Sequence, residues 1–491
     1  MVHQYKNNGY NIVLDVNSGC VHVVDDVVYD IIEKFNEYIN ENRDSYCKEI
    51  NKSEENETNS DKVEDIEKKV TIFKDYFQNN KDEIIVKYGK SLVLEGIDEV
   101  ESLIQTNSLF TEDVYKNYII DFKKRQTVVK ALCLHIAHDC NLACKYCFAG
   151  EGEYQGDRSL MSYEVGKQAL DFLIQNSGNR RNLEVDFFGG EPLMNFDVVK
   201  KLVEYGREQE KIHDKHFRFT LTTNGLLIDD DVIEFANKEM DNVVLSIDGR
   251  KCVHDAMRPT RNGKGSYDII LPKFKKFADS RNQEKYYVRG TFTHNNLDFA
   301  EDVMHLADMG FEQISMEPVV SLPEEPYAIT EDDIPAICAE YDRLAKLIIE
   351  RRKAGKWFNF FHFMIDLSGG PCVAKRLSGC GSGTEYLAVT PWGDLYPCHQ
   401  FVGEDDFLLG TVFDGIKNTE LVDCFKTCNV YAKDKCKECF ARFYCSGGCA
   451  ANSYKFHGSI NDAYDIGCEL QRKRVECAIM IKAAEADLDT E

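Results

Sequence analysis

The sequence predicts a mixed α/β protein in which a parallel sheet lies between an amino-terminal module and a cysteine-rich carboxyl-terminal region. Strands and helices alternate from Ala131 onward, the first 120 residues lack this alternation, and many of the 19 cysteines gather near the carboxyl end. With 491 residues the chain exceeds one ordinary hydrophobic core, so we expect roughly two to four domains.

The amino-terminal module begins with NIVLDV, a turn at residues 17–19 and VHVVD, and then continues into the amphipathic run DVVYDIIEKF. This order predicts a short hairpin followed by a helix. Residues 39–69 are polar and acidic with few apolar side chains, which predicts a mobile insert. Apolar periodicity returns at VTIFKDYF, so a small α+β module fills residues 1–124.

The central part of the chain alternates strand and helix patterns. The run ALCLHIA is followed by LEVDFF, FRFTLTT, NVVLSID, YYVRGTF and EQISMEP, with helical patterns between them. Six such units predict a parallel sheet with helices outside, either a partial barrel or an open doubly wound sheet. In both arrangements the chemistry lies at the carboxyl ends of the strands. A long helical connection over residues 329–369 then precedes the cysteine-rich region.

Composition limits the possible partners and compartments. A formal net charge of −25 argues against nucleic acid, because phosphate binding requires clustered Lys and Arg. No apolar stretch is long enough to cross a bilayer, and the first residues lack a secretory signal, so a cytoplasmic protein is expected. In that compartment cysteines are metal ligands more often than disulfides. Five scattered cysteines are expected to be small buried side chains: Cys20, Cys47, Cys133, Cys252 and Cys338.

The run HDCNLACKYCF places Cys140, Cys144 and Cys147 on one loop after the first central strand. Three thiolates satisfy three irons of a [4Fe–4S] cluster and leave the fourth iron open for a ligand. A structural zinc site is the alternative, but zinc prefers four ligands, usually as two CxxC-type pairs. His138 is the nearby side chain that could complete such a site.

The spacing CxxxCxxC after the first central strand, with GGEP after the second, resembles radical S-adenosylmethionine enzymes. The resemblance implies a partial (β/α)6 TIM-like barrel over residues 125–328. It also implies that S-adenosylmethionine chelates the open iron and is cleaved to a 5′-deoxyadenosyl radical that abstracts hydrogen from the substrate. Motifs at later strand ends match the family's cofactor contacts, which implies this role for Tyr146, Gly189, Gly190, Glu191, Asn224, Ser246, Asp248 and Arg258.

The pattern CxxC-x5-CxxxC followed by a distant cysteine resembles the SPASM extension of peptide-modifying radical enzymes, here residues 370–491. By that resemblance one auxiliary [4Fe–4S] cluster is held by Cys436, Cys439, Cys445 and Cys468. A second is held by Cys380, Cys398 and Cys449, with Cys372 as a possible fourth ligand, which gives three clusters in all. A zinc ribbon is the alternative for the CxxC pairs. Cys424, Cys428 and Cys477 match no ligand position and are expected to be packing or surface residues.

The cysteine loops and the segment ARFYCSGGCAANSY closely resemble maturases of six-cysteines-in-forty-five peptides. The resemblance implies thioether bridges from cysteine sulfur to a backbone α-carbon, with the surplus electron leaving through the auxiliary clusters. It implies a cysteine-rich precursor whose leader binds a winged-helix-like amino-terminal module by strand addition. From the residues alone, a purely structural cap is the alternative for this module. A flavodoxin or ferredoxin would supply low-potential electrons.

Three other activities remain open at this point: formylglycine formation, a carbon–carbon crosslink, and a non-catalytic electron carrier. Anaerobic sulfatase maturases resemble the chain in cluster layout. They carry a catalytic Asp directly after the cysteine that matches Cys398, whereas this chain has His399. That difference counts against formylglycine formation.

Overall fold

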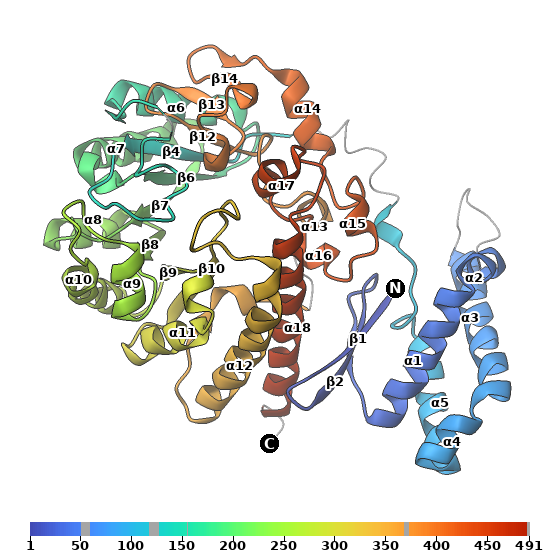
Figure 1. The fold of residues 1–491 in the computed structure, drawn as a ribbon. Helices are drawn as coiled ribbons and strands as arrows, with labels where there is room; N and C mark the ends of the chain where they lie inside the picture. Colours follow the sequence, from blue (N-terminus) through green and yellow to red (C-terminus); the bar gives the residue numbers. More distant parts are fainter. Residues whose placement is uncertain (51–58, 117–126, 155, 368–372, 489–491) are drawn as a thin grey trace.

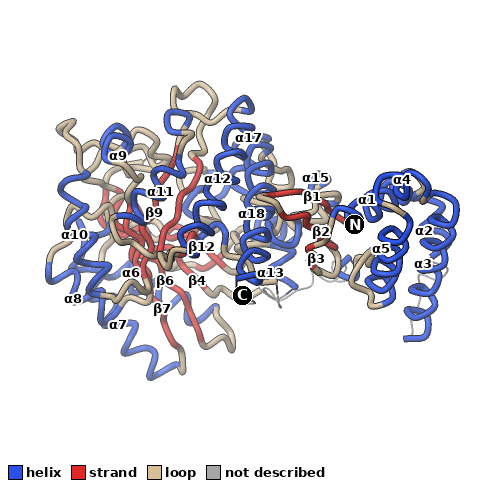
Figure 2. Tube along the Cα trace, turned by 90° about the horizontal axis from the view of Figure 1, so that it is seen from below, coloured by secondary structure: helices blue, strands red, loops and turns tan. Residues whose placement is uncertain are grey.

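The computed structural model describes residues 1–50, 59–116, 127–154, 156–367 and 373–488. Figure 1 shows the amino-terminal module at one side, the central sheet at the other, and the carboxyl-terminal helix α18 between them. The same arrangement is visible from below in Figure 2. In the described part of the chain, no helix is long and apolar enough to span a membrane.

The amino-terminal module begins with an antiparallel sheet in the order β1-β2-β3. The turn between the first two strands uses Asn8 and Gly9, both with positive φ, as tight hairpins require. The following helix is capped by Asp25, whose side chain accepts from the Val28 N–H. The predicted hairpin and helix are confirmed. Their bounds are β1 (Val2–Asn7), β2 (Tyr10–Asp15), β3 (Val21–Val23) and α1 (Asp26–Glu41).

The prediction of a mobile insert over residues 39–69 is wrong for its described parts, which are helical. Phe73 and Phe77 of α3 are buried, and the Phe73 ring meets Phe35 of α1 edge-on at 5.0 Å between centroids. Tertiary packing beyond the polar stretch therefore stabilises helices whose own sequence is unfavourable. Residues 51–58 lie outside the described residues. The helices are α2 (Arg43–Ile50), α3 (Asn59–Asn80), α4 (Asp82–Tyr88) and α5 (Lys90–Gln105).

The six predicted central strands form one parallel sheet in the order β10-β9-β8-β7-β6-β4. The edge strands β11 and β15 are not paired with each other among the described residues, so the barrel is partial. This confirms the predicted fold class. The strands are β4 (Ala131–His138), β6 (Asn182–Gly189), β7 (His216–Thr223), β8 (Asn242–Ser246), β9 (Tyr286–Phe292), β10 (Gln313–Pro318) and β11 (Asn359–Phe360), and β5 (Ser159–Leu160) pairs with β4.

Helices cover the outer face of the sheet, as Figure 1 shows. Their apolar sides join the strands in one core that includes Phe187, Phe217 and Phe274. The long predicted connection is α12. The helices are α6 (Tyr163–Asn176), α7 (Phe196–His213), α8 (Asp230–Glu239), α9 (Lys251–Met257), α10 (Tyr267–Ser280), α11 (Phe299–Asp308) and α12 (Ile334–Lys353).

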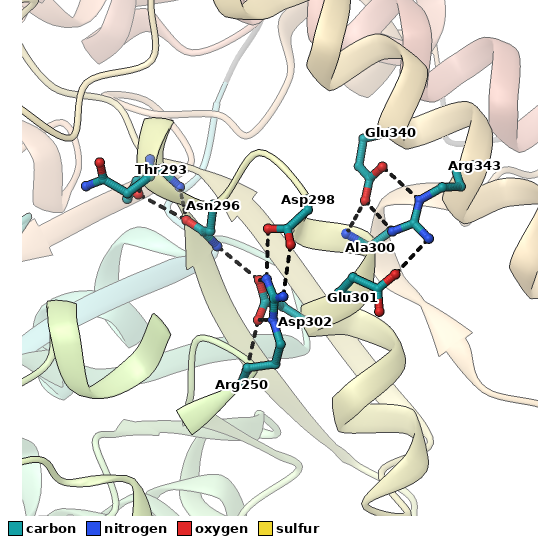
Figure 3. A network of polar contacts seen from close by, with 10 residues as sticks. Arg250, Thr293, Asn296, Asp298, Ala300, Glu301, Asp302, Glu340 and Arg343 are labelled. Atoms are coloured by element: carbon teal, nitrogen blue, oxygen red, sulfur yellow. Dashed lines mark hydrogen bonds and ion pairs between the residues drawn. The ribbon is translucent and has the colours of Figure 1, made fainter. Parts of the chain in front are cut away.

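A polar network fixes the loop after β8 against α11 (Figure 3). The Arg250 guanidinium binds Asp302 at 2.8 Å through Nε and Asp298 at 2.8 and 2.9 Å through its two Nη atoms. A Cβ at Gly249 would lie 2.3 Å from the Cβ of Asp302, so only glycine permits this approach. The network therefore holds the loop that carries Asp248 at a fixed position.

The cysteine-rich region continues the central sheet, because β12 pairs with β4 in parallel. Its long helix α18 packs on α12 and on the amino-terminal sheet. The Tyr5 hydroxyl donates to the Glu476 carbonyl at 2.9 Å. The elements are α13 (Val373–Ser378), β12 (Tyr386–Val389), β13 (Asp394–Tyr396), β14 (Gly410–Thr411), β15 (Gly415–Ile416), α14 (Thr419–Thr427), α15 (Asp434–Lys437), α16 (Arg442–Cys445), α17 (Ala450–His457) and α18 (Asp465–Leu488).

Polar contacts also join the amino-terminal module to this region. The buried Arg442 donates through Nη2 to Asn17 Oδ1 at 2.8 Å and to Asp113 Oδ2 at 2.9 Å. The Tyr431 hydroxyl donates to the same Asp113 carboxylate. Because these groups are buried or half-buried and charge-assisted, they fix how the module sits against the cysteine-rich region.

The scattered cysteines do not all behave as predicted. Cys133 is buried, and Cys20 and Cys338 are half-buried. The prediction of burial is wrong for Cys47 and Cys252, which are exposed because they lie on the solvent-facing sides of α2 and α9.

Candidate functional site

The Cys140–Cys147 loop begins two residues after β4 and is held by backbone bonds to the segment after α9. The Ala143 N–H donates to Pro259 O, and the Lys145 N–H donates to Met257 O, each at 2.9 Å. Burial raises the pKa of Cys140 to about 12, with smaller contributions from Glu191 and the other two thiols of the loop. The three predicted cysteines are thus close enough to interact electrostatically.

The glycine pair after β6 packs directly on the start of this loop. A Cβ at Gly189 would lie 2.4 Å from Ala137 O, and one at Gly190 would lie 2.1 Å from Asp139 O. The Gly190 and Glu191 N–H groups donate to those same two carbonyls. Glycine is therefore required here by the backbone of β4 and of the residue before Cys140.

Glu191 is fully buried and ties the GGEP motif to the TTNG motif. Its carboxylate accepts from the Thr223 hydroxyl and the Asn224 N–H, each at 2.8 Å. Burial raises its pKa to about 7 despite these hydrogen bonds. The Asn224 side chain in turn donates to Asn141 Oδ1 at 2.7 Å and lies 3.6 Å from Cys140 Sγ.

Three further predicted cofactor residues form one buried network. The Tyr146 hydroxyl donates to one oxygen of Asp248, and Arg258 Nε donates to the other at 3.0 Å. The Arg258 guanidinium also lies over the Tyr146 ring, 5.4 Å from its centroid. Ser246 ends β8, two residues before Asp248. The structure therefore brings the loop after β4, the loop after β8 and the MRPT segment together at one edge of the sheet.

The cysteines predicted for one auxiliary cluster, Cys436, Cys439, Cys445 and Cys468, are called here the four-thiol group. All four line one small cavity together with the cationic Lys435, Arg442 and Arg472. Burial raises the pKa of Cys436 to about 12, and the three other thiols raise it further. A cavity walled by four thiols and three cations fits an anionic thiolate-bound iron–sulfur cluster.

The cysteines predicted for the other auxiliary cluster, Cys380, Cys398 and Cys449, are called here the three-thiol group. Burial raises the pKa of Cys398 to about 12, followed by the effects of Cys449 and Cys380, so the three thiols lie close together. Cys372 lies outside the described residues. Cys428, for which the sequence indicated no ligand role, also interacts electrostatically with Cys380, and its thiol donates to Ile460 O at 3.2 Å.

Three rings, called here the aromatic layer, connect the surroundings of the three-thiol group with those of the Cys140–Cys147 loop. Phe148 directly follows Cys147, and its ring lies 5.7 Å from the ring of His399, which directly follows Cys398. Phe188 lies 5.1 Å from the same imidazole. The two predicted cluster sites are therefore neighbours, joined through the rings of residues adjacent to their ligands.

A buried histidine pair beside this layer was not identified from the sequence. His138, considered above as a zinc ligand, lies 3.0 Å from His135 through Nε2 and Nδ1. Both imidazoles are at most 1 % exposed, and Tyr154 stacks on His138 at 4.7 Å. The i, i+3 spacing within one strand gives no sign of this contact, because residues three apart in a regular strand face opposite sides; here the register of β4 shifts between His135 and Ala137.

The thiol spacings bear on the kind of metal site. Within the described ranges, no three His, Cys, Asp or Glu side chains gather closely enough to hold a single metal ion. A four-iron cluster distributes its thiolates over separate irons and so requires a wider spacing than zinc does. The donor set of thiols in groups of three, three and four fits such clusters.

Comparison with known proteins supports a four-iron cluster in the part of the chain that carries Cys140, Cys144 and Cys147. A family model described as a 4Fe-4S single cluster domain matches residues 129–271. An uncharacterised protein of Methanocaldococcus jannaschii is 32% identical over 191 residues, which cover 38% of this chain and 62% of that protein. A cysteine-type anaerobic sulfatase-maturating enzyme of Clostridium novyi is 25% identical over 352 residues, covering 67% of this chain and 90% of that enzyme.

Two solved structures show the same fold. The enzyme anSMEcpe with bound AdoMet aligns with a TM-score of 0.60 at 20% identity, over 73% of this chain and 99% of that chain. Streptococcus suis SuiB bound to precursor peptide SuiA aligns with a TM-score of 0.50 at 16% identity, over 95% and 100%. The chain shares the fold of these two proteins, one of which is solved with bound AdoMet, and its sequence is similar to that of an anaerobic sulfatase-maturating enzyme.

Proposed function

We propose that the protein is a peptide maturase that forms thioether crosslinks from cysteine sulfur to backbone α-carbons in a cysteine-rich precursor. The observation that carries this proposal is the position of the three-thiol group, one aromatic layer from the Cys140–Cys147 loop. A substrate thiol held at that group would lie beside the place where substrate hydrogen is removed. Sulfur is a natural ligand for an open iron.

The loop and its neighbours have the donors to hold S-adenosylmethionine. Cys140, Cys144 and Cys147 would hold a [4Fe–4S] cluster, which with bound S-adenosylmethionine supplies the 5′-deoxyadenosyl radical. The Glu191 carboxylate and the Gly189–Gly190 carbonyls would accept from the methionine ammonium. The remaining contacts, proposed for the ribose, the adenine or the carboxylate, come from Tyr146, Asn224, Ser246, Asp248 and Arg258.

The chain's own residues give this site a fixed shape. The Arg258 guanidinium keeps its charge, because Asp248 and Tyr146 outweigh burial and hold its pKa above the usual range. A charged, buried guanidinium with a fixed partner can orient a cofactor carboxylate without reorganisation. The rings of Phe148 and Phe188 cover part of the His399 imidazole.

The amino-terminal module is proposed to bind the precursor's leader. Strands β1 and β3 are the two edges of its sheet, so an extended leader can add as a further strand. The proposed division is residues 1–124 for this module, 125–328 for the barrel, 329–369 for the connection and 370–491 for the region with two auxiliary clusters. A flavodoxin or ferredoxin is the proposed electron donor.

The test is anaerobic incubation of the holoenzyme with reductant, S-adenosylmethionine and a cysteine-rich precursor. The expected product is lighter by two hydrogens per bridge, resists alkylation at the bridged sulfur, and forms together with 5′-deoxyadenosine. An unchanged peptide mass without deoxyadenosine would exclude the proposal.

Formylglycine formation is the second candidate, because a relative that is 25% identical is a cysteine-type sulfatase-maturating enzyme. Its product carries an aldehyde that reacts with hydrazides, whereas a thioether does not. His399 after Cys398 favours the thioether reaction, since sulfatase maturases resemble this chain but carry Asp there.

A further inference from the structure

A buried arginine lies in the walls of two cavities, one beside the amino-terminal module and one beside the cluster region. The first cavity, about 340 Å³, is lined by the β2–β3 turn at residues 16–19 and by α18. The second, about 270 Å³, is lined by the residues after β10 and by Cys445, Cys449 and Cys468. Gln471 and Arg474 line both cavities. A chain running from the module to the clusters along these cavities must pass Arg474.

The Arg474 guanidinium has incomplete hydrogen bonding. The residue is 8% exposed, and its Nε donates to the Tyr341 hydroxyl at 2.8 Å. Its Nη2 atom is buried without a hydrogen-bond partner among the described residues and lies 3.5 Å from Glu317 Oε2. A buried guanidinium with an unused donor is costly, so a further acceptor at this point would be stabilising.

The charge around this point is also unbalanced. Glu317 lies 3.5 Å from Arg474 and 3.9 Å from Arg289, so two cations share one carboxylate. His362 is neutral here, because burial lowers its pKa to about 3. The first cavity otherwise presents one cation and one anion, Arg376 and Asp366. Glu317 therefore divides its charge between the buried Arg474 and the exposed Arg289.

We propose that these two cavities hold an extended segment of the precursor peptide and that Arg474 binds a carboxylate of that segment. This inference rests on the proposed function, because the segment in question is the part of the precursor between the leader and the crosslinked core. Arginine suits this role, since its planar fork can bind a carboxylate through two parallel hydrogen bonds. The expected substrate feature is an Asp or Glu side chain, or a free carboxyl terminus, upstream of or beside the modified cysteines.

The test measures binding to the full-length reconstituted holoenzyme by fluorescence anisotropy. Three labelled probes are compared: the amidated peptide Gly-Ser-Glu-Ala-Glu-Ser-Gly-Cys, the same peptide with both Glu replaced by Gln, and the Gln peptide with a free carboxyl terminus. We expect the Glu probe to bind about tenfold more tightly than the amidated Gln probe, as a charged hydrogen bond predicts. A preference for the third probe would assign the site to a carboxyl terminus.

Variants separate recognition from folding. The double variant Arg474→Gln/Glu317→Gln removes both members of the buried ion pair, so neither charge is left unpaired. The ratio of the affinities for the Glu and Gln probes should fall to about one. The single Glu317→Gln variant should bind the Glu probe more tightly than wild type, because a competing carboxylate is removed. Arg343→Gln is the control. Arg343 binds Glu301 of α11 and Glu340 of α12, and it lines neither cavity.

The inference is overturned if the wild-type protein binds the Glu and Gln probes equally, or binds neither below about 1 mM. It is also overturned if the double variant keeps the preference. Because binding is measured without turnover, thioether formation with no probe preference would refute this inference alone. A probe preference without deoxyadenosine would refute the proposed function alone.

Discussion

The four-thiol group and the three-thiol group lie in the same part of the chain, yet they are assembled differently. Three members of the four-thiol group come from ten consecutive residues, and the fourth, Cys468, comes from α18. The three-thiol group draws on separate segments: before β12, after β13 and before α17. The first is a local site closed by a helix, whereas the second exists only when the sheet has formed.

The two groups also differ in the polarity of the residues around them. Lys435, Arg442 and Arg472 line the cavity of the four-thiol group. Cys398 of the three-thiol group instead packs in a cluster with Tyr154, Phe401 and Phe425. Cations stabilise a permanently anionic cluster, while an apolar layer excludes water next to a reactive position. We therefore propose electron transfer for the four-thiol group and binding of the substrate sulfur for the three-thiol group.

The largest effect is expected for Cys398→Ala. Thioether formation should fall at least about 1000-fold, equivalent to about 4 kcal/mol of activation free energy, because the substrate sulfur loses its position. Deoxyadenosine formation should stay within about tenfold of wild type, since the Cys140–Cys147 loop is intact. Mass spectrometry and chromatography measure the two products. The exposed Cys424→Ala is the control, and a thioether yield near wild type in Cys398→Ala would contradict the assignment.

The second effect is expected for Cys468→Ala in the four-thiol group. Protein-bound iron should fall by about one third, because one of three four-iron clusters is lost. Thioether yield should fall by about 100-fold, or about 3 kcal/mol, since the surplus electron has no acceptor. Iron analysis and product quantification test this. Cys477→Ala is the control, since Cys477 is buried on the opposite face of α18. If this variant lowers the iron content equally, the cluster proposed for Cys468 is wrong.

The strand ends were predictable from the sequence, because buried apolar strands alternate with amphipathic helices and short motifs follow directly. Cys140, Glu191, Asn224 and Asp248 all lie at the carboxyl ends of β4, β6, β7 and β8, as expected. Periodicity reports one element at a time, which is why α2 and the first half of α3 were missed, although the apolar pattern from Val70 onward was recognised. Their stability comes from packing against α1, a contact that no local pattern contains.

Contacts between distant segments were equally hidden. The ring contact of Phe148 with His399 joins residues 251 positions apart, and Arg474 meets Glu317 across the barrel mouth. Resemblance proposed the ligands, whereas the ring contacts between the two proposed cluster sites are visible only in the folded chain. The role of the glycine pair also changed: Gly189 and Gly190 are required by the backbone of β4, in addition to any contact with a cofactor.

A third prediction concerns the proposed S-adenosylmethionine site and leaves both thiol groups unchanged. Asp248→Asn should raise the KM for S-adenosylmethionine by about 10- to 100-fold, because Arg258 and Tyr146 lose their shared partner. Iron content should be unchanged. Deoxyadenosine rates at varied cofactor concentration measure the effect. Asp268→Asn is the control, since Asp268 is exposed and pairs with Lys251 at the surface. Equal effects in both variants would exclude a cofactor role for Asp248.

The smallest expected effect is a pH dependence that belongs to the radical site and to neither thiol group. Burial raises the pKa of Glu191 to about 7, so its negative charge is present above that pH and lost below it. Affinity for the cofactor ammonium should therefore fall several-fold between about pH 7.5 and pH 6, and Glu191→Gln should remove this dependence.

The raised pKa of Glu191 also makes the free energy of unfolding depend on pH. Folding favours the neutral carboxyl, so the free energy of unfolding of the cofactor-free protein should decrease as pH rises from about 4.5 to about 7, the window between the usual and the folded pKa. Calorimetric titration measures the affinity, and thermal unfolding measures the stability. If Glu191→Gln changes neither pH profile, Glu191 only caps the turn after β6, and cofactor binding depends on other groups.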